Sequence, residues 1–274
     1  MANIQTLDPD ASPLAYYGGE LRRQREAQGL TQPQLGTIIF CTGSLVGQIE
    51  TTKKIPTRDF SERVDAALGT DGTFSRLVGL VLRSQLPTWF QPYADMEAKA
   101  AYISTYQAQV VYGLLQTEEY ARALLRVEHP RRVEEMVAAR LERQRILKRK
   151  DAPPLWVVLS EAALLQEVGG HAVMRKQLAR LLEFQDDPWV QIQVVPFTVG
   201  QHTAMMGSFN LLRFDDDPDL FYVESYDQGH MTANPSVIKE RSVGYARLQA
   251  SALSPEDSAT LITRVMEERY GNQS

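Results

Sequence analysis

The chain has 274 residues, of which 43% are hydrophobic and 23% are charged, and its formal net charge is −5 at pH 7. This length and composition predict a globular protein of two domains, each with its own core. No apolar run is long enough to span a membrane and no export signal is expected at the start, so we expect a cytoplasmic protein. The single cysteine, Cys41, excludes an internal disulfide and a zinc site built from several cysteines.

The first predicted elements are short helices that follow one another closely. Residues 14–28 form an amphipathic helix that ends before Gly29, a residue suited to the left-handed conformation that terminates helices. Thr31 and Gln34 have the spacing of a capping box, which starts a second helix directly after Thr31. Thr42 offers a cap for a third short helix. Two short helices joined by a tight turn predict a helix-turn-helix.

The third helix is the predicted DNA-reading element. Its outward face is expected to carry small or amide-bearing residues, which let a helix lie deep in a major groove: Gly43, Ser44, Gly47 and Gln48. Ser44 and Gln48 are the candidates for contact with base edges. The predicted DNA-contacting residues are Gln32, Thr42, Gly43, Ser44, Gln48, Lys53, Lys54 and Arg58, with phosphates expected at Gln32, Lys53, Lys54 and Arg58.

Residues 21–56 resemble the XRE family of repressor-like DNA-binding domains. The resemblance implies that Arg25 pairs with Glu50 and ties the first helix to the end of the recognition helix. Two positions depart from the family pattern, since Phe40 and Thr52 stand where the family usually has glycine. Such sites often require a positive φ. A residue other than glycine there either lowers the stability of the fold by about 1 kcal/mol or adopts a different turn. A small helical bundle without DNA-binding function is the alternative interpretation.

The charge of this region is weak for a DNA-binding domain. Residues 14–60 contain six basic and four acidic residues. Because affinity for phosphates comes from lysine and arginine, one copy is expected to bind modestly. We therefore expect a homodimer on a two-fold operator of double-stranded DNA, with half-sites about 34–36 Å apart or a multiple of that spacing.

Two further helices, over residues 57–68 and 74–86, complete a predicted all-α five-helix domain over residues 1–86. The segment that follows has two prolines around two large aromatic residues, which is typical of a boundary that packs against the next domain. We therefore place the second domain at residues 87–274.

The second region alternates between helical and extended patterns and is predicted to be α+β, with a mixed sheet of about four to five strands flanked by helices. The predicted strands are 102–106, 155–159, 190–195, 207–214 and 220–225, and the last two form a hairpin. The predicted helices lie near 96–101, 117–126, from 131 onward, from a cap at Ser160 onward, 173–184, 236–252 and from 254 onward.

Several short motifs of this region resemble actinobacterial antitoxin-like (WhiJ-like) regulators. The resemblance rests on Trp89-Phe90, the helix around Glu97, residues 113–123, residues 140–144, residues 160–164, residues 194–197 with Gly200, residues 207–209 and residues 252–255. It implies an XRE-type domain followed by a domain of poorly assigned function, commonly encoded beside a small partner protein. Tyr112 replaces a proline of the family pattern. The implied role is a repressor of development or specialised metabolism whose second domain receives an input from a protein or a small ligand.

The segment 131–150 is strongly basic, with eight basic residues against three glutamates. We interpret it as one long, solvated amphipathic helix, and a second phosphate-contacting surface is the alternative. An acidic small partner would be attracted to this face.

No feature of the sequence indicates an enzyme. The four histidines, His129, His171, His202 and His230, lack the spacing of metal ligands. The acidic loop 215–219 suits a tight turn better than a calcium site, and no phosphate-binding loop of the P-loop type is present. We expect no catalytic residues, no metal and no cofactor.

The sequence thus predicts a transcriptional regulator that binds specific DNA sequences and acts as a repressor. Its second domain is expected to receive a signal from a small partner protein. Two alternatives remain open, namely an antitoxin-like module that neutralises a small protein and a regulator that senses a small molecule.

Overall fold

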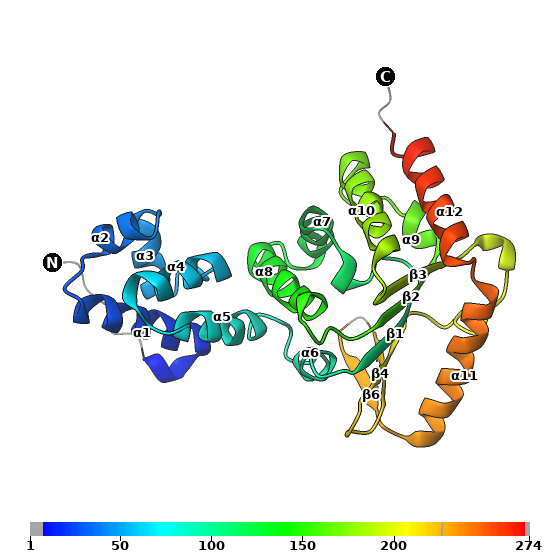
Figure 1. Cartoon of the computed structure of the whole chain (residues 1–274), viewed down its shortest axis with the longest axis horizontal. Helices are drawn as coiled ribbons and strands as arrows, with labels where there is room; N and C mark the ends of the chain where they lie inside the picture. The colour runs from blue at the N-terminus through cyan, green and yellow to red at the C-terminus, as the bar shows by residue number, and fades with distance from the viewer. Residues whose placement is uncertain (1–7, 226, 272–274) are drawn as a thin grey trace. The chain divides into compact units, whose positions relative to one another are not determined.

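A computed structural model describes residues 8–225 and 227–271 of the chain. The chain forms two compact units, Met1–Pro87 and Thr88–Ser274, here called the N-terminal unit and the C-terminal unit. Figure 1 shows the helices and strands of each unit along the chain. The described residues contain no helix that is long and apolar enough to cross a membrane.

The N-terminal unit is all-α, as predicted. A short 3₁₀ helix η1 (Pro9–Ala11) precedes five α-helices, which are α1 (Pro13–Ala27), α2 (Gln32–Ile38), α3 (Gly43–Glu50), α4 (Arg58–Leu68) and α5 (Thr73–Arg83).

Side-chain caps start most of these helices. Ser12, Thr31, Thr42 and Thr57 each accept a hydrogen bond from a backbone N–H in the first turn of the helix that follows. Helix α5 has no such cap, because the residue before it is a glycine. Its first turn instead donates to the carboxylate of Asp65 in α4, from the backbone nitrogens of Phe74 at 2.9 Å and Ser75 at 2.8 Å. Asp65 therefore joins α4 to α5.

The core of the N-terminal unit fixes α3 against the other helices. Its side chains, each at most 2% exposed, include Tyr17, Leu21, Leu35, Ile39, Val46, Ile49, Val64, Phe74 and Val78. The ring of Phe74 lies edge-on to that of Tyr17, with centroids 5.2 Å apart, and the Tyr17 hydroxyl bonds to Ser61 Oγ at 2.8 Å. Burial of these apolar side chains is the main source of the unit's stability.

The C-terminal unit is built around a six-stranded mixed sheet. The strands are β1 (Tyr102–Gln107), β2 (Leu155–Ser160), β3 (Val190–Val195), β4 (Phe209–Arg213), β5 (Leu220–Glu224) and β6 (Gly229–Thr232). Their order is β3-β2-β1-β4-β5-β6, with β1, β2 and β3 parallel and the other neighbours antiparallel. The predicted hairpin is confirmed as β4 and β5.

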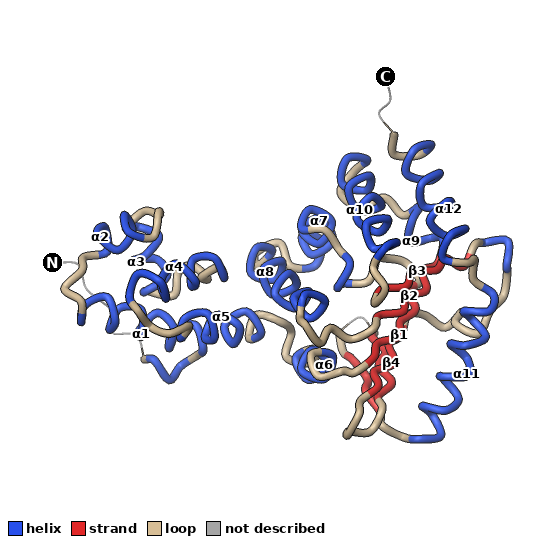
Figure 2. The backbone as a smooth tube through the Cα atoms, viewed as in Figure 1, coloured by secondary structure: helices blue, strands red, loops and turns tan. Residues whose placement is uncertain are grey.

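Helices cover both faces of this sheet. They are α6 (Gln91–Glu97), α7 (Glu118–Glu128), α8 (Val133–Arg143), α9 (Glu161–Leu165), α10 (His171–Glu183), α11 (Pro235–Ser251) and α12 (Pro255–Glu268). Figure 2 shows α11 on one side of the strands and α6 and α8 on the other. Ile238, Tyr245 and Leu248 of α11 pack with side chains from β1, β2, β4 and β5.

The structure differs from the sequence prediction at three places. The sheet has a sixth strand, β6, whose four residues are too few to give a recognisable alternation. Helix α6 begins at Gln91, earlier than predicted, because Pro92 occupies the first turn, where a proline is tolerated. The basic segment is not one long helix, since α8 ends at Arg143 and a 3₁₀ helix, η3 (Gln144–Lys148), follows.

Candidate nucleic-acid interface

Helices α2 and α3 form the predicted helix-turn-helix, and its local signals are confirmed. The Thr31 hydroxyl accepts from the backbone nitrogen of Gln34 at 3.3 Å, and the Thr31 nitrogen donates to Gln34 Oε1 at 2.7 Å. This is a complete capping box. The hydroxyl of Thr42 accepts from the nitrogen of Leu45 at 3.2 Å and starts α3.

Two residues next to these helices have left-handed backbone conformations. Phe40, in the turn after α2, has φ 57°, and Thr52, after α3, has φ 58°. These are the two positions at which the sequence departs from the glycine of the family pattern, and both keep the positive φ. Each non-glycine residue there costs about 1 kcal/mol. The ring of Phe40 is 86% exposed, so burial of its side chain does not offset this cost.

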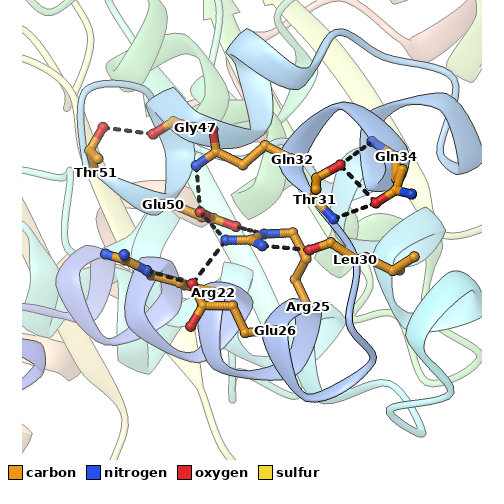
Figure 3. A network of polar contacts seen from close by, with 10 residues as sticks. All are labelled: Arg22, Arg25, Glu26, Leu30, Thr31, Gln32, Gln34, Gly47, Glu50 and Thr51. Carbon is orange, nitrogen blue, oxygen red and sulfur yellow. Dashed lines mark hydrogen bonds and ion pairs between the residues drawn. The ribbon is translucent and has the colours of Figure 1, made fainter. Parts of the chain in front are cut away.

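A buried ion pair ties α1 to the end of α3 (Figure 3). Arg25 Nε donates to Glu50 Oε1 at 2.6 Å, and Arg25 Nη2 donates to Glu50 Oε2 at 3.0 Å. Arg25 is 6% exposed and Glu50 is 3% exposed. The hydrogen bond to Glu50 is the main cause that raises the pKa of Arg25. This is the pair that the family resemblance implies.

The network extends to the loop before α2 and to α2 itself. Arg25 Nη1 donates to the carbonyl oxygen of Leu30 at 2.6 Å, and Gln32 Nε2 donates to Glu50 Oε2 at 2.8 Å. Gln32 was predicted to hold a phosphate, but its side-chain amide is engaged inside the domain. The network sets the orientation of α3 against α1 and α2.

The glycines of α3 let α2 approach closely. A Cβ atom at Gly43 would lie 2.7 Å from the backbone nitrogen of Pro33, and one at Gly47 would lie 2.8 Å from Gln32 Oε1. The prediction that Gly43 and Gly47 lie on the outward face of α3 is therefore wrong. Both face α2: at Gly43 the backbone of Pro33 leaves no room for a side chain, and at Gly47 the side-chain amide of Gln32 fills that space.

The remaining predicted residues of α3 are exposed. Ser44 and Gln48 lie one helical turn apart on the open face, with Gln48 Nε2 3.4 Å from Ser44 Oγ. Thr42 is also exposed. Lys53 and Lys54 lie in the turn after α3 and are exposed, and the backbone nitrogens of both donate to the carbonyl oxygen of Gln48. In the described part of the chain, neither lysine forms an ion pair.

Arg58 makes a contact between two helices of the N-terminal unit. Its guanidinium Nη1 donates to the carbonyl oxygen of Ser75 in α5 at 2.9 Å, and the side chain is half-buried. Arg58 thus joins α4 to α5, and its role as a phosphate contact stays a prediction. The sequence could not show this, because the acceptor is a backbone carbonyl 17 residues away.

Sequence reasoning missed a polar cluster in the C-terminal unit. Arg140 and Arg143 were predicted on a solvated helix face, but Arg143 Nε lies 2.7 Å from Glu97 Oε2, with side chains 11% and 0% exposed. Tyr93 and Tyr112 also bond to this glutamate. The available signal was Glu97 four residues after Tyr93, a spacing that places both on one helix face.

Comparison with known proteins gives two matches. Residues 17–76 match a family described as a helix-turn-helix domain, which covers the chain from α1 into α5. Residues 90–264 match a family described as a domain of unknown function (DUF5753). No curated protein and no solved structure matches the chain.

Proposed function

Because the chain belongs to the family defined by the domain of unknown function DUF5753 and carries a helix-turn-helix domain before it, we propose that it is a transcriptional repressor that reads its operator with α3. The helix-turn-helix domain makes the chain a DNA-binding regulator. Repression follows if the bound protein excludes polymerase from the operator. The protein acts in the cytoplasm, and catalysis is no part of this proposal.

The observation that carries the proposal is the exposed pair Ser44 and Gln48 on a helix whose orientation is fixed. A glutamine amide can pair with adenine through two hydrogen bonds in the major groove, and a serine hydroxyl can bond to several base edges. Such contacts discriminate between bases only if the helix is held rigidly. The buried bonds between Arg25 and Glu50 supply that rigidity.

Phosphate contacts are assigned to the residues that flank this pair. Lys53 and Lys54 are exposed in the turn after α3, and Thr42 presents a hydroxyl directly before it. Contacts of this kind position the protein on the duplex without carrying sequence information. Gln32 and Gly43 take the role of positioning α3, since both face the interior of the helix pair.

Tight binding is proposed to require two copies of the chain. Residues 14–60 have only two more basic than acidic residues, so the field that attracts one copy to DNA is weak. A symmetric dimer doubles the contacts and reads a two-fold operator whose half-sites lie about 34–36 Å apart, or a multiple of that spacing.

A selection from a random DNA library tests this function. The full-length protein at near-physiological salt should enrich one two-fold symmetric sequence with the half-site spacing given above. Enrichment of an unsymmetrical site would contradict binding as a symmetric dimer. The absence of any enriched sequence would contradict specific DNA recognition.

For the C-terminal unit we propose an input from a small acidic partner protein. The resemblance to antitoxin-like regulators supports this role, and so does an exposed basic surface formed by Arg145, Lys148, Arg149 and Lys150. Arg149 and Lys150 line a hollow of about 250 Å³ together with Trp189, which is 57% exposed. Complementary charge would attract an acidic protein to this surface.

Coupling between partner and operator must be reciprocal. If the partner weakens operator binding by some factor, the operator weakens partner binding by the same factor. If the partner binds equally well with and without operator DNA, this regulation is excluded. The remaining role of the C-terminal unit would then be to neutralise the partner, as an antitoxin does.

A further inference from the structure

Strand β3 forms one edge of the sheet, and this edge is only partly paired. In the part of the chain that the structure describes, β2 lies on one side of β3 and no strand lies on the other. Near the end of β3, the nitrogen of Val194 donates to Ser258 Oγ and its oxygen accepts from the nitrogen of Leu253, both at 2.9 Å. At the start of β3, the nitrogen of Val190 donates to the carbonyl oxygen of Asp187 at 3.2 Å.

Between these two residues lies Ile192, whose backbone is unpaired on the outer side. Every second residue of a strand directs its N–H and C=O groups to the same side, so Ile192 faces outward as Val190 and Val194 do. The inner side agrees, because Leu155 of β2 donates to the carbonyl oxygen of Trp189 at 2.7 Å. Among the described residues, the outward N–H and C=O of Ile192 have no partner. Since Ile192 is half-buried and backbone groups away from water are nearly always paired, this free pair requires an explanation.

A cavity lies against this part of β3. Its volume is about 220 Å³, and Ile192 forms part of its wall. The rest of the wall comes mainly from the end of α10, the turn after it and the first half of α12, with the apolar side chains of Leu181, Leu182, Phe184, Ala259 and Ile262. Because an apolar cavity of about 150 Å³ can already bind benzene, this one has room for a molecule of one or two rings.

The charges around the cavity favour a neutral ligand. Asp187 lines the cavity, and its carboxylate would repel an anion. The same residue lines the neighbouring hollow together with Arg149 and Lys150, whose positive charges oppose a cation. The other polar residues of the cavity wall, Gln185 and Gln191, are neutral. A neutral molecule therefore fits this site best.

The geometry points to a binding site for a small cyclic amide between the free backbone groups of Ile192 and the cavity. A cyclic amide holds its N–H and C=O side by side. It can therefore donate to the carbonyl oxygen of Ile192 and accept from its nitrogen, as a residue of an added antiparallel strand would. Its rings lie in the cavity between α10 and α12 and bury apolar surface there. The site itself is independent of DNA binding, and only its use as a regulatory input rests on the proposed function.

Calorimetric titration of the full-length protein with oxindole, a cyclic amide of two fused rings, tests the site. We expect saturable binding at one site per chain. The matched probe is N-methyloxindole, which has the same rings but no N–H. It leaves the carbonyl oxygen of Ile192 unpaired and should bind about tenfold more weakly. This comparison uses the wild-type protein and needs no variant.

A second test fills the cavity from its wall. Ala259→Leu places a larger side chain at the cavity and should weaken oxindole binding at least about tenfold. The control is Ala250→Leu, the same change at an exposed position of α11, which should bind like the wild type. Should Ala259→Leu fail to fold in a thermal unfolding assay, the comparison of the two probes still decides. Lack of saturable oxindole binding, equal binding of the two probes, or equal binding by a folded Ala259→Leu variant would each overturn the proposal. None of these results depends on operator binding.

Discussion

Arg25 and Glu50 form a bidentate ion pair across 25 residues of sequence, with N–O distances of 2.6 Å and 3.0 Å and both side chains almost fully buried. The pair joins α1 to the last turn of α3. Because paired guanidinium and carboxylate groups have matching planar geometry, the pair fixes a direction as well as a distance.

Removal of one partner should therefore be costly. Arg25→Ala leaves the buried Glu50 carboxylate uncompensated, and we expect the free energy of unfolding to fall by about 3–5 kcal/mol. Chemical denaturation followed by circular dichroism measures this loss. The control is Arg22→Ala, which breaks the exposed pair with Glu26 and should cost less than about 1 kcal/mol. Equal effects of the two substitutions would contradict the role of the buried pair.

Substitution of the exposed Phe40 by glycine should stabilise the protein. The residue has φ 57° and an 86% exposed ring, so glycine relieves strain at no cost in burial. We expect a gain of about 1 kcal/mol in the free energy of unfolding. Phe40→Ala keeps the Cβ atom and should give no gain. A gain of the same size with alanine would mean that the aromatic ring, and not the backbone, is the source of the strain.

The carboxylate of Asp65 makes the stability of the N-terminal unit depend on pH in the acidic range. Burial opposes the charged form, but hydrogen bonds from Thr70, Ser75 and the Phe74 nitrogen outweigh it and lower the pKa of this carboxyl. Because the pKa is lower in the folded state than in the unfolded chain, where it is about 3.9, the ionised carboxylate stabilises the fold at pH values above about 3.9. This contribution is lost as the pH falls through the folded-state pKa.

Asp65→Asn should therefore lower stability at neutral pH and flatten the loss of stability between about pH 5 and about pH 2. The melting temperature as a function of pH measures both effects. Asp71→Asn, at an exposed position, should leave the profile unchanged. An Asp65→Asn variant with the wild-type slope would show that this carboxylate does not control the acid transition.

Lys53→Ala should weaken binding to all DNA sequences alike. Loss of one phosphate contact should reduce the slope of log affinity against log salt by about one unit. Fluorescence anisotropy with the selected operator and with unrelated DNA gives both slopes. Lys99→Ala makes the same change at an exposed position in the C-terminal unit and should leave the slope unchanged. A loss confined to the operator would instead assign Lys53 to base recognition.

The sequence predicted best those features that depend on residues close together. Thr31, Thr42 and Thr57 mark helix starts because a cap involves neighbours three residues apart. The left-handed conformations of Phe40 and Thr52 could be expected because a turn of fixed length demands them. The architecture of both units followed from such signals.

Features that depend on distant partners could not be predicted from the residues alone. Arg58 was assigned to phosphate, but its acceptor is a backbone carbonyl in the next helix. Arg140 and Arg143 were placed on a solvated face, since the charge pattern of α8 does not reveal that Glu97 and Gln116 lie opposite. Gly43 was placed outward because a glycine has no side chain whose polarity indicates a face.

We propose that α3 reads DNA sequence through Ser44 and Gln48. The most direct test is genome-wide capture of DNA by purified full-length protein at near-physiological salt, repeated with a variant that carries Ser44→Ala and Gln48→Ala together. We expect the wild type to recover a few two-fold symmetric sites and the double variant to lose them while it keeps its thermal stability. Recovery of the same sites by the double variant would contradict the claim.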